Sequence, residues 1–114
     1  MPETATQQKV RLDPQDQGRL SILFNRHLAQ YPDAVVYLFG SRVSPTRQGG
    51  DLDLLIVSRQ AARNAYALRK QLRIAIKEQL GDQKIDIVVC PEPQARGQSA
   101  FTRLAFQEGV QIWP

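Results

Sequence analysis

The chain has 114 residues, of which 42% are hydrophobic, and its formal net charge is +4 at pH 7. This length suits one compact domain, and no apolar run is long enough to span a bilayer. The single cysteine, Cys90, excludes an internal disulfide and a cysteine-based metal site. With no visible signal peptide, the cytoplasm is the expected location. The positive charge suits an anionic partner, but no aromatic residues alternate with the basic ones as nucleic-acid stacking would require.

Residues 1–12 are polar and unpatterned, which predicts a flexible N-terminal arm followed by a single domain over 13–114. Asp13 and Pro14 are typical of a helix start, and apolar residues then recur at helical spacing, so we expect a helix over 14–30. The run from Val35 to Phe39 is apolar and rich in β-formers, which predicts a buried strand.

Leu52 to Val57 predicts a second buried strand. The loop that joins it to the first is too short for a helical crossover, so the two strands should be antiparallel. Ser58 is a candidate cap for a long helix over about 60–80, which Gly81 would end. A third strand is expected over 85–89, then a shorter helix over 98–108 and an edge strand over 110–113. The pattern predicts an α/β (α+β) fold with a small mixed β-sheet flanked by helices.

A Gly-Ser turn and a pair of carboxylates stand out against this background. Gly40 and Ser41 follow the first strand, and Asp51 and Asp53 begin the second. Residues two apart in a strand project to the same face, so both carboxylates should point to one place. Two close anions repel unless a cation lies between them, and oxygen-only ligands favour Mg²⁺ or Mn²⁺. Glycine lets the turn approach a ligand closely, and free backbone N–H groups there suit a triphosphate.

Asp86 is a third candidate, because it is a charged residue in an otherwise apolar strand. If the second and third strands are neighbours, Asp86 can lie beside Asp51 and Asp53. The alternative is a solvated strand end or a partner for Lys84. Arg42, in the loop after Ser41, is a candidate for neutralising phosphate charge, although loop arginines are often plain surface residues.

A basic face is expected on the long helix, opposite its apolar side. Such a face is usually only solvated, and a patch that binds a partner is the less common interpretation. The residues assigned to it are Arg63, Lys70, Arg73 and Lys77.

Together, Gly40-Ser41, Asp51-x-Asp53 and Asp86 resemble the nucleotidyltransferase superfamily related to DNA polymerase beta. The short length and the ending from Gly109 to Trp113 look more specifically like the minimal nucleotidyltransferases of antitoxin type. The resemblance implies that Gly40, Ser41 and Arg42 bind the nucleotide. It also implies that Asp51, Asp53 and Asp86 are the catalytic residues and bind two Mg²⁺ ions, with ATP as substrate. Nine residues separate Ser41 from Asp51, one fewer than in many minimal members.

The resulting hypothesis is transfer of AMP from ATP to a hydroxyl, expected to be a tyrosine, of a partner protein. By resemblance, that partner is a helical toxin of the HEPN type, and the chain is its antitoxin. One alternative is a non-catalytic subunit that neutralises its partner by occlusion. Others are transfer to a small molecule or to RNA, which rank lower because no acceptor domain or stacking surface is evident. Nucleic-acid and membrane partners are not expected, and assembly with itself or with a partner stays open.

Overall fold

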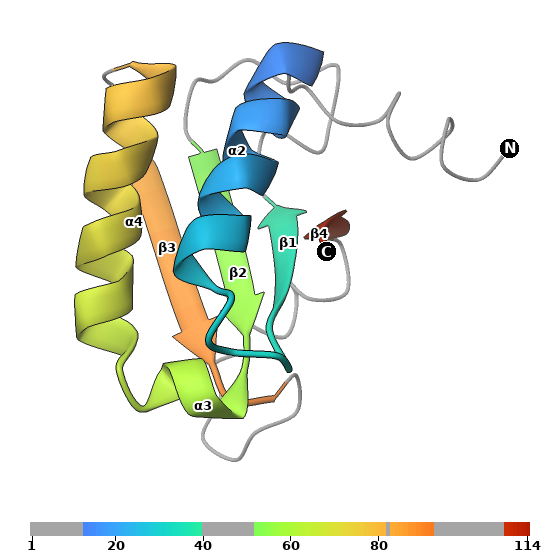
Figure 1. The fold of residues 1–114 in the computed structure, drawn as a ribbon, viewed down its shortest axis with the longest axis vertical. Helices are drawn as coiled ribbons and strands as arrows, with labels where there is room; N and C mark the ends of the chain where they lie inside the picture. Colours follow the sequence, from blue (N-terminus) through green and yellow to red (C-terminus); the bar gives the residue numbers. More distant parts are fainter. Residues whose placement is uncertain (1–12, 40–51, 82, 93–108) are drawn as a thin grey trace, which may run out of the picture.

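The computed structural model describes residues 13–39, 52–81, 83–92 and 109–114 (Figure 1). Three helices and four strands lie in these ranges. They are α2 (Pro14–His27), β1 (Val35–Phe39), β2 (Leu52–Val57), α3 (Arg59–Ala62), α4 (Ala65–Leu80), β3 (Ile85–Cys90) and β4 (Val110–Trp113). The flexible arm predicted over 1–12 and the helix predicted over 98–108 lie outside the described residues.

The four described strands form one mixed sheet in the order β3-β2-β1-β4. β1 pairs with β2 and with β4 in antiparallel fashion, whereas β2 and β3 are parallel. The predicted fold class, the antiparallel first pair and the edge strand at 110–113 are therefore confirmed. The chain passes from β2 to the parallel β3 through α3 and α4, as a parallel connection requires.

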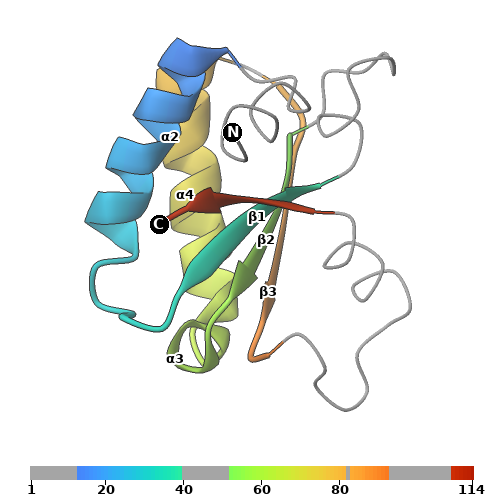
Figure 2. The same ribbon diagram turned by 90° about the vertical axis from the view of Figure 1, so that its right-hand side faces the viewer.

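The helices α2 and α4 lie on the same side of the sheet (Figure 2). The main core lies between them and the sheet, and it takes alternate residues of the strands. From β2 it takes Leu52, Leu54 and Ile56, each completely buried. Residues of the opposite parity, including Leu55 and Cys90, form a smaller buried cluster on the other face. Cys90 is 7% exposed in this cluster, and burial raises the pKa of its thiol.

The first helix ends earlier than predicted. α2 begins at Pro14, with the Asp13 carboxylate accepting a hydrogen bond from the Gln15 N–H at 2.8 Å, but it stops at His27 rather than at residue 30. The chain then turns through hydrogen bonds from the Tyr31 N–H to the Leu28 carbonyl and from the Ala34 N–H to the Tyr31 carbonyl. The helical conformation is disfavoured for Tyr31 because Pro32 follows it.

The long helix predicted over 60–80 is two helices. Ser58 does act as a cap, because its Oγ accepts a hydrogen bond from the Ala61 N–H at 3.0 Å, but the helix that it caps is the four-residue α3. Arg63 ends α3, and Asn64 precedes α4. Gly81 ends α4 as predicted, with a φ of 94°.

The carboxylate of Asp33, which precedes β1, holds the junction between β2 and α3. Asp33 accepts hydrogen bonds from the Ser58 hydroxyl at 2.7 Å and from the Arg59 N–H at 2.9 Å. The Ser58 bond, followed by the backbone bonds, lowers the pKa of Asp33. Ser58 is 1% exposed, so its hydroxyl depends on these partners.

Within the described part of the chain, no helix combines the length and the apolar character needed to cross a bilayer.

Candidate active site

Two of the three predicted carboxylates are direct neighbours in the sheet. Asp53 in β2 and Asp86 in β3 are register partners in the parallel pair. Backbones of adjacent strands lie about 4.8 Å apart, and side chains at one register position project to the same face. The condition attached to Asp86, that its strand should neighbour the second one, is therefore met.

The face to which these carboxylates project follows from the burial of their neighbours. Leu52 and Leu54, on either side of Asp53, belong to the core beneath α2 and α4. Ile85 and Ile87, on either side of Asp86, belong to the same core. Because side chains alternate along a strand, Asp53 and Asp86 point to the opposite face, away from the two helices.

Both carboxylates retain access to solvent or to a ligand. Asp53 is half-buried and Asp86 is exposed. The cost of burying an unpaired charge, which was one reason to single out Asp86, therefore does not arise. A hydrogen bond of 2.9 Å from the Leu52 N–H to the Lys84 carbonyl connects the starts of the two strands. It helps to fix the register that places Asp53 beside Asp86.

The end of β1 lies at the same place. Phe39, its last residue, is the register partner of Asp53 in the antiparallel pair. Gly40 follows Phe39 directly in the sequence, so the chain enters the predicted Gly40-Ser41-Arg42 segment beside Asp53. These three residues and Asp51 lie outside the described residues, and their assignment stays a prediction.

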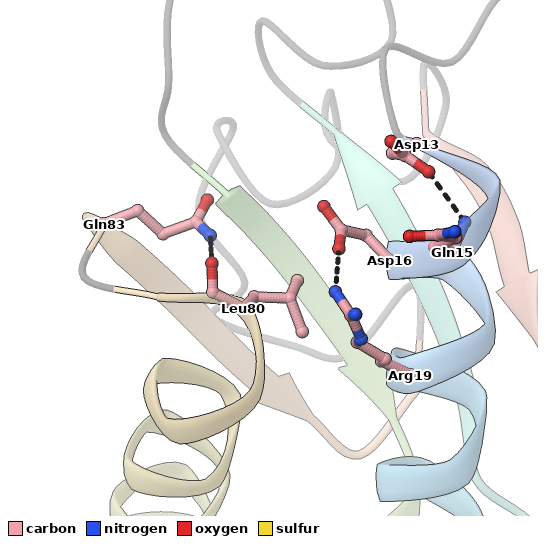
Figure 3. Close-up of polar contacts among 6 residues, drawn as sticks. All are labelled: Asp13, Gln15, Asp16, Arg19, Leu80 and Gln83. Carbon is pink, nitrogen blue, oxygen red and sulfur yellow. Dashed lines mark hydrogen bonds and ion pairs between the residues drawn. The ribbon is translucent and has the colours of Figure 1, made fainter.

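This end of the sheet is also where α2 begins and α4 ends (Figure 1). Local contacts hold both helix ends, as Figure 3 shows. Asp13 caps α2, and Arg19 pairs with Asp16 at 3.1 Å. After α4, the Gln83 amide donates to the Leu80 carbonyl at 3.5 Å, just before the chain enters β3. The backbone that carries Asp86 therefore starts from an anchored position.

The donor chemistry fits a hard divalent cation. Asp53 and Asp86 offer only carboxylate oxygens, which are the ligands that Mg²⁺ and Mn²⁺ prefer. No group of three or more potential metal-binding side chains occurs among the described residues. The predicted third ligand, Asp51, immediately precedes that range and has the same parity as Asp53.

A comparison with protein families gives a match. A family model described as "Nucleotidyltransferase domain" matches residues 20–105, which include all three carboxylates and the Gly-Ser turn. A search of curated proteins found no match.

Proposed function

The chain belongs to the nucleotidyltransferase domain family, and we propose that it transfers AMP from ATP to a hydroxyl, most simply a tyrosine, of a partner protein. In this proposal it acts in the cytoplasm as the antitoxin of a helical HEPN-type toxin. The observation that carries the catalytic part is the register pairing of Asp53 with Asp86 on the face of the sheet opposite α2 and α4. The protein acceptor is supported by the resemblance to minimal nucleotidyltransferases, and the experiment below decides it.

In the proposed reaction, the acceptor hydroxyl oxygen forms a bond to the α-phosphorus of ATP. The bond between that phosphorus and its bridging oxygen breaks, and pyrophosphate leaves. Asp86, which is more exposed than Asp53, takes the proton of the acceptor hydroxyl. Asp51, Asp53 and Asp86 together would hold the Mg²⁺ ions. When bound, the two ions neutralise charge on the entering and leaving oxygens.

The nucleotide is assigned to the end of β1. Gly40, Ser41 and Arg42 follow Phe39, the partner of Asp53, so a triphosphate bound by that segment would have its α-phosphate near the carboxylates. Backbone N–H groups of a glycine turn and one guanidinium are suited to phosphate oxygens.

The test uses ATP labelled at its α-phosphate, Mg²⁺ and a host lysate. We expect one labelled protein band with the wild type, and loss of that band with Asp53→Asn and with Asp86→Asn. The matched control is Glu78→Gln, which makes the same charge change at an exposed acid of α4, the helix on the other side of the sheet. This variant should label as the wild type does.

Other outcomes would overturn parts of the proposal. Label found only in RNA or in small molecules would keep nucleotidyl transfer and refute the protein acceptor. If no label is transferred, and Asp53→Asn still neutralises a toxin co-expressed with it, occlusion by a non-catalytic subunit replaces catalysis.

A further inference from the structure

One surface of α4 combines positive charge with an exposed aromatic ring. Tyr66, Arg69, Lys70 and Arg73 line a hollow of about 300 Å³. Tyr66 comes three and four residues before Arg69 and Lys70, and Arg73 comes four and three residues after them, so the four residues lie on one side of the helix. Tyr66 is 73% exposed, which is unusual for so large a ring. We call these four residues the α4 surface.

Among the described residues, no acidic side chain pairs with the cations of this surface. The ion pairs found among the described residues are Arg19 with Asp16 and Arg59 with Glu92, and neither belongs to the α4 surface. α4 contains one acidic residue, Glu78, which is five positions after Arg73. Five residues correspond to about 140° around a helix, so Glu78 projects from a different side.

The α4 surface is separate from the candidate active site. α4 covers one face of the sheet (Figure 2). The burial of the neighbouring residues shows that Asp53 and Asp86 point from the other face. A molecule bound to the α4 surface therefore leaves the carboxylates accessible.

We propose that the α4 surface is a docking site for an acidic patch of a partner protein. This proposal extends the proposed function and depends on it in one respect, namely that the partner is a protein. Arginine side chains bind carboxylates through two parallel hydrogen bonds, and tyrosine and arginine are enriched at protein interfaces. Ile74, 53% exposed and four residues after Lys70, adds apolar area at the border.

Protein fits this surface better than nucleic acid. Single-stranded nucleic acid is bound by several aromatic rings that stack successive bases. The α4 surface has one ring, Tyr66, and its three cations lie within about one turn of helix. Carboxylates three or four residues apart on a partner helix have the same spacing as these cations.

The experiment measures binding without ATP or Mg²⁺, so that its outcome is independent of catalysis. The probe is a labelled helical peptide that presents glutamate and leucine on one face, followed by fluorescence anisotropy. We expect Lys70→Glu and Arg73→Glu each to weaken binding about tenfold. The control Arg26→Glu makes the same charge change at an exposed residue of α2 and should change binding less than twofold.

Two further arms separate the explanations. Asp53→Asn should bind the peptide as the wild type does, even if it transfers no nucleotide. A single-stranded RNA that binds more tightly than the peptide would overturn the proposal, as would equal losses in Arg26→Glu and Lys70→Glu or an absence of peptide binding. Circular dichroism checks that each variant is folded.

Discussion

Because Asp53 and Asp86 are register partners, we predict that their two negative charges destabilise the fold when no metal is bound. Adjacent strands place the backbones of these two residues about 5 Å apart, and we use this spacing for their carboxylates. At that separation, two unit charges repel by about 1 kcal/mol in a water-like medium. Asp86 is exposed, so this screened value is the appropriate one. Replacing it by Asn removes the repulsion, and the apo protein should become more stable by about 1 kcal/mol.

The assay is thermal unfolding in EDTA at low ionic strength, followed by titration with Mg²⁺. For a chain of this size, 1 kcal/mol corresponds to about 4 °C in the melting temperature, so apo Asp86→Asn should melt about 4 °C above the wild type. Mg²⁺ at ten times its dissociation constant should stabilise the wild type by about 1.4 kcal/mol. The variant, having lost a ligand, should gain much less. The order of the two melting temperatures should therefore reverse when Mg²⁺ is added.

The control is again Glu78→Gln, whose melting temperature should respond to Mg²⁺ as that of the wild type does. A lower melting temperature for apo Asp86→Asn would mean that a cation of the protein, such as Lys84, already compensates this carboxylate. Equal stabilisation of wild type and Asp86→Asn by Mg²⁺ would refute the assignment of Asp86 as a ligand.

Four further predictions concern the frame that holds the site. Ser58→Ala removes both the α3 cap and the donor to Asp33, and should lower the free energy of unfolding by about 2 kcal/mol in urea titrations. Gly81→Ala should cost about 1–3 kcal/mol, because a φ of 94° with a ψ of 176° strains any residue with a Cβ even though the space there is open. Gly18→Ala, within α2 and equally open, should instead stabilise by about 0.5–1 kcal/mol. The hydrogen bonds that lower the folded-state pKa of Asp33 add stability above the unfolded pKa, near pH 4, which is lost as the pH falls through the folded pKa. Acid titrations of Asp33→Asn should therefore lose less stability below pH 4 than those of the wild type.

The strands, and the end of the sheet at which the site lies, were predictable because both follow from local sequence patterns. A run of β-formers defines each strand, and the short loop before Asp51 excludes a parallel crossover between the first two. Whether Asp86 lies beside Asp53 depends on which strands are neighbours. The sequence did not determine this, so the prediction was made on the condition that the second and third strands are adjacent. The helical connection from β2 to β3 makes these strands parallel neighbours with the two residues in register.

The break between α3 and α4 was missed because its cause is not local. The spacing of apolar residues continues from Ala61 to Leu80, so periodicity alone suggests one helix. The corner is fixed by Asp33, which is 25 residues before Ser58 and binds both its hydroxyl and the next N–H. The one local signal was Asn64, a residue type that favours helix starts.

The same break corrects the predicted basic face. Arg63 ends α3 and is not part of α4, so it does not belong to a continuous helical face with Lys70, Arg73 and Lys77. The half-buried Arg69 lines the hollow instead, together with Tyr66.

The burial of β2 explains why a single charge was so informative. This strand is central and apolar on both faces, so its sequence has no alternation between polar and apolar residues that would separate one face from the other. Leu55, two residues after Asp53 on the same face, is completely buried. A carboxylate at that position would lose its hydration and destabilise the fold by several kcal/mol. The strand therefore tolerates a charge only near its beginning, where Asp53 remains half-exposed. Asp86 lies beside Asp53 at this same end of the sheet.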